Sequence, residues 1–425
     1  MRPVNEAIKA CIDLSQRPSI EQRSLALCAG YFLAEDVVGN APLPRWSQSA
    51  MDGYAVKAHE ALAGAVLQVG EVIPAGHWPQ STLSVGEAAR IFTGAPLPNG
   101  ADAVVIQENT TYDQASNQVH ILKSSLSGDN VRNAGEEIIA DAVIATRHQQ
   151  ITPGLLGLCA AQGLSQLPVF TRSKVAIIET GSELISPGQV LNGAQIYATN
   201  AVTLVPMIEY SFGQVVSVSR VSDEVSEVVE HIRNTMRMGA RLIVTTGGVS
   251  VGDFDPIHDA LQQLGAKRTF WKVKMKPGKP ISVATLPNAN GDPCILVGLP
   301  GNPVSCVVGY LLFLHPLIQS LAGVSLDKLG LRRIKCTLKH TLTKTHSRAE
   351  LFRVRLSRLI ETNHPFQADY HCELTGGQSS AWVSSISAAH GLLYAPSTPI
   401  SWQEGDTVEV ALFPWVDLHE CNHFF

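Results

Sequence analysis

The chain lacks the features of a secreted protein. Its N-terminus, MRPVNEAIKACIDLSQ, has neither the apolar core nor the small-residue cleavage site of a signal peptide. The eight cysteines form no C-x-x-C pair, so we expect buried thiols in a reducing compartment rather than disulfides or a metal knuckle. These absences predict a cytoplasmic protein.

A basic excess and a long apolar run are also missing. The net charge of -5 gives no field that would attract nucleic acid or an anionic membrane. The longest apolar run, PVSCVVGYLLFLHP, is bracketed by prolines and is too short to cross a bilayer. With 425 residues, 45% of them hydrophobic, the chain can instead bury several cores, and we expect several domains.

Signatures of two common classes of site do not occur. The fourteen histidines show no H-x-H or H-E-x-x-H spacing, which argues against a zinc site. There is no Walker A sequence, which argues against a P-loop nucleotidase.

What is present is an alternation of strand and helix patterns over residues 173–325. Short apolar runs such as KVAIIET, QVVSVSRV, RLIVTT and CILVGLP predict strands, and the segments between them predict helices. Repeated βα units of this kind predict a three-layer αβα domain with a mostly parallel sheet. Ligands of such sheets bind beyond the carboxyl ends of the strands.

Three of the predicted strands end in glycine and polar residues, in the stretches TGSE, TGGVS and GLPGNP. Taken singly, such glycines only permit a tight turn between strand and helix. Together with Ser250, with Asn302 as a helix cap and with Pro303 at the first helical position, they predict one shared anion-binding pocket.

The stretch TFWKVKMKPGKP carries a row of lysines. Strand alternation predicts Lys272, Lys274 and Lys276 on one face, and the bend at PGK returns Lys279 towards them. Like charges in a row repel one another, so they either guard an edge strand or face an anionic ligand. We favour the ligand.

Two aspartates, Asp253 and Asp255, follow the glycines of RLIVTTGGVSVGDFDP. One of them is expected to cap the next helix. Carboxylates beside lysines and a phosphate cradle also suit Mg²⁺, which takes one or two carboxylates and completes its shell with water and phosphate oxygens. Asp223, in VSDE, has the same two interpretations, and the helix cap is the simpler one.

The flanking regions differ from the central domain. Residues 1–42 with 141–172 predict a mixed N-terminal linker domain, 43–140 a β-rich second domain, and 326–425 a C-terminal β-barrel. Loops of the second domain carry Asp52, Thr93, Arg132, Glu136 and Glu137, and the pair Asp52-Gly53 is typical of a turn.

The stretches SAMDGYA, TGAPLPNGADAVV, TTGGVSVGDFD, KMKPGKP and GLPGNPVS occur in this order. Over nearly its whole length the chain therefore resembles the MoeA family of molybdopterin molybdenumtransferases, which includes the E domain of gephyrin. The resemblance implies insertion of molybdenum from molybdate into adenylylated molybdopterin, with Mg²⁺-dependent release of AMP and formation of molybdenum cofactor. It also implies a homodimer of four-domain subunits, in which the second domain contributes to the partner's site. Contacts with the molybdopterin adenylyltransferase and with acceptor molybdoenzymes are left open.

The resemblance assigns roles at the matching positions. The catalytic residues would be Asp255, Asp52, Lys272 and Lys276, and the Mg²⁺ ligands would be Asp255 and Asp223. The pterin would be bound by Gly181, Ser182, Glu183, Gly247, Gly248, Ser250, Gly298, Pro300, Asn302 and Pro303, with Thr93, Arg132 and Glu137 from the second domain. Molybdate would be bound by Lys276, Lys279, Ser305, Arg353 and Ser380, because lysine and arginine donate several hydrogen bonds and neutralise a dianion.

The chain departs from the family pattern at two places. The family reads T-G-D-E-L where this chain has Ser182, so one carboxylate is missing, and it reads G-E-D where this chain has Glu137. The first departure makes a catalytically weak molybdopterin-binding or carrier protein the alternative to the enzyme. A gephyrin-like scaffold is a third reading, but it would need an appended module for which four domains in 425 residues leave no room.

Overall fold

A computed structural model describes residues 1–15, 18–248, 256–288, 291–358 and 370–418. Ser250, Asp253 and Asp255, singled out from the sequence, lie outside these ranges. The chain divides into two compact units: 1–21, 30–34 and 168–425 form the larger unit, and 22–29 with 35–167 form the smaller one. The division falls within β1 (Ile20–Ser24) and β12 (Gln166–Phe170). The finer division into four domains stays a prediction.

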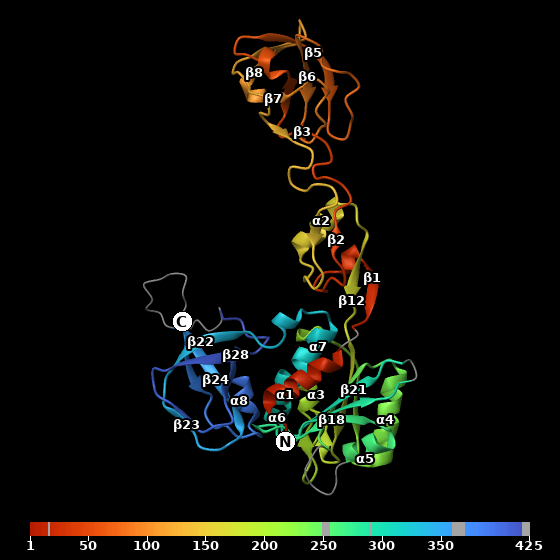
Figure 1. The fold of residues 1–425 in the computed structure, drawn as a ribbon, viewed down its shortest axis with the longest axis vertical. Coiled ribbons are helices and arrows are strands. Elements are labelled where there is room, and N and C mark those ends of the chain that lie inside the picture. The colour runs from red at the N-terminus through yellow and green to blue at the C-terminus, as the bar shows by residue number, and fades with distance from the viewer. Residues whose placement is uncertain (16–17, 249–255, 289–290, 359–369, 419–425) are drawn as a thin grey trace. The chain divides into compact units, whose positions relative to one another are not determined.

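A six-stranded sheet is the centre of the larger unit (Figure 1). Its order is β16 (Gln214–Val221), β13 (Lys174–Thr180), β17 (Leu242–Thr246), β21 (Cys294–Leu299), β20 (Ser282–Leu286) and β18 (Lys267–Trp271). The first four strands run parallel, whereas β20 is antiparallel to both of its neighbours. The mostly parallel sheet is thus confirmed, and β20 is a strand that the sequence pattern did not predict.

Helices cover both faces of this sheet (Figure 1). Alternate residues of each buried strand point to opposite faces. Ile177 and Val244 pack in the core with α1 (Val4–Ile12), α3 (Asn200–Tyr210), α6 (Pro303–Gly309) and α7 (His315–Leu321). Ile178 and Ile243 pack in a second core with α4 (Val225–Arg237) and α5 (Pro256–Gln263). The three-layer αβα architecture is therefore confirmed.

The helix that starts at Pro303 is longer than the apolar run in the sequence suggested. A π-helical turn, η5 (Tyr310–Leu314), joins α6 to α7, and the segment continues past Pro316 to Leu321. By length and composition these 19 residues could cross a membrane, so the expectation that the run is too short was wrong. However, 89% of the segment is buried inside the fold, as in the core helix of a globular domain.

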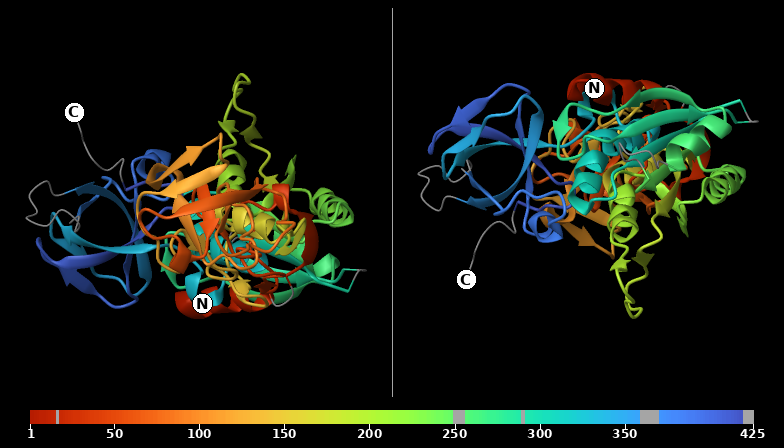
Figure 2. Two further views of the ribbon diagram at one scale, coloured as in Figure 1. Left: turned by 90° about the horizontal axis from the view of Figure 1, so that it is seen from above. Right: turned by 90° about the horizontal axis from the view of Figure 1, so that it is seen from below.

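A closed barrel lies at the C-terminal end of the larger unit (Figure 2). Strands β24 (Ala349–Arg358), β25 (Tyr370–Leu374), β22 (Arg333–Leu338), β28 (Thr407–Leu412) and β26 (Gly391–Ala395) pair in this order, and β26 pairs back with β24. A short pair, β23 (Leu342–Lys344) with β27 (Ile400–Trp402), and α8 (Val383–Ser387) complete it. The predicted β-barrel is confirmed.

The lysine-rich strand is broken in a way that the alternation did not predict. Strand β18 ends at Trp271 because Lys272 adopts the left-handed φ of 68°. Its ammonium lies 3.8 Å from the centre of the Trp271 ring. A separate strand, β19 (Met275–Lys276), then pairs with β24 of the barrel. The prediction that Lys272, Lys274 and Lys276 share one face of a continuous strand was therefore wrong.

The smaller unit contains a second six-stranded sheet. Its order is β7 (Ala103–Ile106), β4 (Gly53–Val56), β6 (Glu87–Ile91), β5 (Val66–Ile73), β9 (Gln118–Ile121) and β8 (Thr110–Asp113). Two short pairs, β3 (Gln48–Ser49) with β10 (Val131–Arg132) and β2 (Val37–Val38) with β11 (Val143–Ala145), and the helix α2 (Pro153–Ala161) accompany it. Gly53 begins β4 rather than sitting in a turn. Glycine is needed there because a Cβ would lie 2.0 Å from the Val105 carbonyl oxygen.

Candidate functional site

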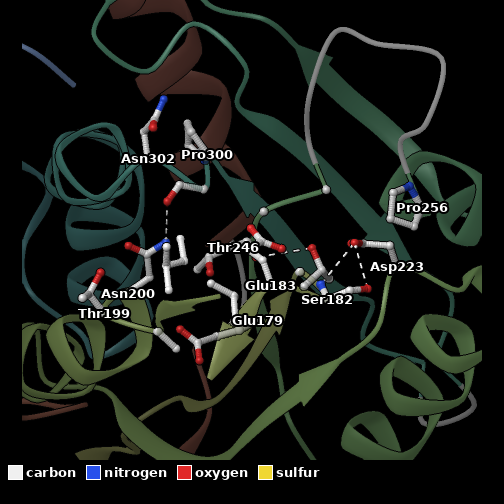
Figure 3. Close-up of a pocket in the computed structure, with 18 of the residues that line it drawn as sticks. Glu179, Ser182, Glu183, Thr199, Asn200, Asp223, Thr246, Pro256, Pro300 and Asn302 are labelled. Atoms are coloured by element: carbon white, nitrogen blue, oxygen red, sulfur yellow. Dashed lines mark hydrogen bonds between the residues drawn. The ribbon is translucent and has the colours of Figure 1, made fainter. Parts of the chain in front are cut away.

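A cavity of about 1010 Å³ opens at the carboxyl ends of β13, β17 and β21, where the sequence predicted the pocket (Figure 3). The predicted residues that line it are Gly181, Ser182, Glu183, Asp223, Gly247, Gly248, Pro300, Asn302 and Pro303. Gly298 is different, because it is buried within β21 and is not part of the lining. Short strands β14 (Leu184–Ile185) and β15 (Ile196–Tyr197) border the cavity.

Glycine is required where the tips of β13 and β17 meet. Gly247 has φ of 84°, and a Cβ there would lie 2.4 Å from the carbonyl oxygen of Thr180. Gly248 has φ of 61°, and its Cβ would lie 2.9 Å from the Thr180 hydroxyl. Any side chain would push the two strand ends apart. The two glycines thus set the shape of the cavity floor.

Ser182 and Asp223 lie together on the wall of the cavity (Figure 3). The amide and hydroxyl of Ser182 donate to Asp223 Oδ2, over 3.4 and 3.5 Å. The cap residue of α4 is Glu224, so the interpretation of Asp223 as the N-cap was wrong. An aspartate at position 182 would put a second carboxylate beside Asp223, and two adjacent carboxylates favour a divalent cation.

A buried carboxylate that the sequence reasoning missed also faces the cavity. Glu179 is 2% exposed, accepts a 2.9 Å hydrogen bond from the Ala201 amide in the first turn of α3, and lies 3.3 Å from Arg220. Asn200 next to it donates to the Gly301 carbonyl over 2.9 Å. The only signal in the sequence was a glutamate that interrupts the apolar run KVAIIET.

Thr246 supplies a polar atom without a partner. Its residue is 1% exposed, and its hydroxyl has no hydrogen bond among the described residues although it belongs to the cavity lining. Buried hydroxyls are normally hydrogen-bonded, and a bound ligand would satisfy this one.

The five residues expected to bind molybdate come from four segments that pack together. A Cβ at Gly278, between Lys276 and Lys279, would lie 3.5 Å from the Ser305 carbonyl oxygen. The Val304 amide donates to the Ser380 carbonyl over 3.1 Å. Arg353 donates to the neighbouring carbonyl of Ser379, also over 3.1 Å. Pro280 and Ala381, which are adjacent in sequence to Lys279 and Ser380, line the cavity, as does Pro303, two residues before Ser305.

Arg353 is the buried cation of this group. It is 1% exposed, and its guanidinium also donates to the Ser385 hydroxyl over 3.3 Å. Burial lowers the pKa of Arg353 to about 10, so the side chain stays charged at neutral pH. Within the described ranges it forms no ion pair with a carboxylate, and a buried cation of this kind favours an anionic ligand.

The smaller unit brings two predicted residues, Asp52 and Thr93, into contact, and a third, Arg132, lies on a strand paired with β3. Asp52 accepts hydrogen bonds from the amide and the hydroxyl of Thr93, both over 2.8 Å, and these bonds lower the pKa of the Asp52 carboxyl. The Thr93 loop is tied to β3 through the Ser49 amide, which donates to Ala95, and β3 pairs with the strand that carries Arg132. Glu137 is exposed on the following turn, and its amide donates to the Leu43 carbonyl over 3.0 Å, away from this group.

Neither a disulfide nor a cluster of metal-binding side chains is found within the described residues. The seven cysteines within the described residues are all buried and none of them forms a disulfide there, as expected from their scatter. In the same ranges, which omit 249–255, no group of three or more His, Cys, Asp or Glu side chains could hold a metal. The metal role predicted for Asp255 stays a prediction.

Comparison with known protein families covers nearly the whole chain. The MoeA N-terminal region (domain I and II) matches residues 2–163, a probable molybdopterin binding domain matches 176–320, and the MoeA C-terminal region (domain IV) matches 335–413. A crystal structure of a molybdopterin biosynthesis MoeA protein from Pyrococcus horikosii is 27% identical, with a TM-score of 0.80, and covers 97% of this chain and 98% of its own.

Two relatives extend the match in sequence. Molybdopterin molybdenumtransferase 2 of Mycobacterium tuberculosis (strain CDC 1551 / Oshkosh) is 33% identical over 419 residues, 96% of this chain and 97% of its own. The molybdopterin molybdenumtransferase of Bacillus subtilis (strain 168) is 30% identical over 417 residues, 96% and 94% respectively. With three family regions in order and full-length similarity, this chain belongs to the MoeA family of molybdopterin molybdenumtransferases.

Proposed function

We propose that the chain inserts molybdenum from molybdate into adenylylated molybdopterin, which releases AMP and yields molybdenum cofactor. One observation carries the proposal: a large cavity at the strand tips lies next to a group of cations that includes the buried Arg353. A cavity and a neighbouring cationic site suit a substrate with an anionic tail together with a second, separate oxyanion. Full-length similarity to molybdopterin molybdenumtransferases supports the same reaction.

Each part of the site would have its own task. The backbone of Gly247 and Gly248, together with the free hydroxyl of Thr246, would bind the phosphate or pterin edge. Lys276, Lys279 and Arg353 would hold molybdate by charge-assisted hydrogen bonds and keep it next to the dithiolene sulfurs. Holding two reactants side by side is a large part of the rate enhancement in such a transfer. A water molecule would attack the pterin phosphorus, so that a new P–O bond forms as the diphosphate bond breaks and AMP leaves.

The donor set fits Mg²⁺. Asp223, Glu183 and Asp259 place carboxylates on the cavity wall, and Mg²⁺ needs only one or two of them when water and phosphate supply the other ligands. Asp223 would hold the ion together with Asp255. When bound, the ion would supply positive charge that offsets the charge of the diphosphate.

The direct test is release of AMP from adenylylated molybdopterin by the pure protein. We expect AMP only when Mg²⁺ is present, and molybdenum cofactor only when molybdate is added as well. Pterin that binds without turnover would favour the carrier alternative instead.

The lysines provide the first prediction. Lys276→Ala and Lys279→Ala should each raise the molybdate concentration for half-maximal activity, by roughly ten- to a hundredfold, since each change removes one charge-assisted contact. Lys276→Ala should have the larger effect, because it also removes the ammonium that lies 2.8 Å from the buried carboxylate of Glu350. Pterin binding, measured by fluorescence, should barely change. An unchanged molybdate requirement in both variants would exclude the assignment.

Ser182 provides the second prediction, and it separates the enzyme from the carrier. If the hydrogen bond from Ser182 to Asp223 replaces the function of the missing carboxylate, Ser182→Asp should leave turnover within a few-fold of the parent. The Mg²⁺ concentration for half-maximal activity should fall by roughly threefold or more, because two carboxylates would then face the ion. Ser182→Asn, which adds similar bulk without charge, is the control. A large gain in turnover would show that this chain is a weakened member of the family.

The assembly is a further part of the proposal. We expect a homodimer in which Asp52, Thr93, Arg132 and Glu137 serve the pocket of the partner subunit, as the family resemblance implies. The substrate, adenylylated molybdopterin, must come from a molybdopterin adenylyltransferase. The product, molybdenum cofactor, would pass to acceptor molybdoenzymes.

A further inference from the structure

A buried carboxylate stands directly behind the lysine proposed to bind molybdate. Lys276 Nζ lies 2.8 Å from Glu350 Oε1, and the Glu350 side chain is only 6% exposed whereas that of Lys276 is 42% exposed. The backbone enforces this contact, because β19 and β24 run parallel with Lys276 opposite Glu350. The ammonium of Lys276 is therefore partly exposed to solvent while the buried carboxylate of Glu350 holds it in place.

The second oxygen of Glu350 is fixed as well. His346 Nε2 lies 2.9 Å from Glu350 Oε2, and His346 Nδ1 accepts the Arg348 amide over 3.3 Å. Because Nδ1 accepts, the ring carries its proton on Nε2 and donates it to the carboxylate. Lys344 in turn donates to the carbonyls of His346 and Thr398, over 2.6 and 2.8 Å, which holds this loop in place.

Glu350 also changes the charge of the surroundings. Lys276, Lys279 and Arg353 are the cations of the proposed oxyanion site, and the charge of Glu350 acts on Arg353 as well as on Lys276. No other carboxylate pairs with these three side chains within the described ranges. A negative charge next to an anion site weakens anion binding, and it does so strongly where solvent is largely excluded.

We propose that Glu350 is a positioning residue that holds the Lys276 ammonium in place and reduces the affinity of the site for oxyanions, with His346 fixing its orientation. The inference rests on the proposed function, since it assumes that Lys276 meets molybdate. Moderate affinity has a chemical purpose here. The oxyanion must leave its cations when molybdenum passes to the dithiolene, and tight ground-state binding would slow that step.

The test is Glu350→Gln, which keeps the size of the side chain and removes its charge. Titration calorimetry with molybdate alone should give a dissociation constant at least about fivefold lower than that of the parent. Turnover at saturating molybdate should fall by about tenfold, because the ammonium is no longer held and the oxyanion leaves more slowly. Tighter binding together with slower turnover is a result that simple loss of structure does not produce.

Glu350→Asp is the matched control, because it keeps the charge and withdraws the carboxylate by one methylene. Its molybdate dissociation constant should stay within about twofold of the parent's while its turnover falls. If Glu350→Gln does not fold, His346→Gln replaces it: turnover should fall by roughly threefold with unchanged molybdate binding, and unchanged turnover overturns the inference.

The remaining outcomes are also decisive. Molybdate binding by Glu350→Gln that is unchanged or weaker than the parent's overturns the role of Glu350. If the parent protein itself binds no molybdate and releases no AMP, the proposed function fails instead.

Discussion

Gly247→Ala should lower turnover by at least about a hundredfold while leaving the protein folded. A Cβ at this position would lie 2.4 Å from the Thr180 carbonyl oxygen, so the tips of β13 and β17 would have to separate. A displacement on the order of 1 Å at a binding site is enough to cost about two orders of magnitude in rate. The positive φ of 84° adds about 1–2 kcal/mol of backbone strain for alanine. Pterin affinity and AMP release are the measurements.

Gly239→Ala is the control that separates the clash from the strain. Gly239 follows α4 with a nearly identical φ of 83°, but a Cβ there would meet nothing closer than the Lys174 ammonium at 3.8 Å. We expect Gly239→Ala to lower the melting temperature slightly and to keep pterin affinity and turnover. If the two variants lose activity equally, the contact with Thr180 does not shape the site.

The sequence was sufficient where the determining signal is local. Apolar runs that end in glycine predicted β13, β17 and β21 and the edge of the sheet at which the cavity opens. The cap and first-turn signals of Asn302 and Pro303 likewise matched the start of α6. These features depend on residues within one or two turns of each other, so a single sequence contains them.

The sequence alone did not predict the contacts of residues whose partners lie far away in the chain. The alternation of lysines predicted one strand face, but β18 ends where Lys272 adopts a positive φ, and β19 joins a barrel strand some 74 residues further on, with Lys276 opposite Glu350. Nothing near Lys276 in the sequence indicates that partner. The buried Glu179 depends in the same way on Arg220 and on the first turn of α3. A buried charge is stable only when it is paired or hydrogen-bonded, and the partners of these residues are far away in the sequence and close only in the fold.

Asp52→Ala should inactivate the protein through the smaller unit. The Asp52 carboxylate accepts both hydrogen bonds that fix Thr93, and its depressed pKa keeps it charged. Loss of the carboxylate would remove a charge and release the Thr93 loop together. Asp113→Ala is the matched control, because Asp113 is an exposed aspartate of the same unit whose pKa is lowered by bonds to Ser116 and Ala115. We expect that control to retain full activity.

Mixing inactive variants tests whether Asp52 serves the partner's pocket. Suppose that Asp52→Ala and Asp255→Ala are each inactive, and that the two proteins are unfolded and refolded together in equal amounts. Random pairing in a two-fold dimer gives about half heterodimers. If Asp52 of one subunit and Asp255 of the other form one site, each heterodimer has one site with both lesions and one with none. Activity should then return to roughly a quarter of the parent level.

A site within one subunit gives a different result, because every site in the mixture then carries one lesion. Differently tagged subunits, purified through both tags in sequence, would yield pure heterodimer, for which the shared site predicts about half of the parent activity. Activity that stays at the level of the single variants in that pure heterodimer would exclude the shared site. It would assign Asp52 to the pocket of its own chain, while the roles of Gly247 and Glu350 would be unaffected, since both belong to the larger unit.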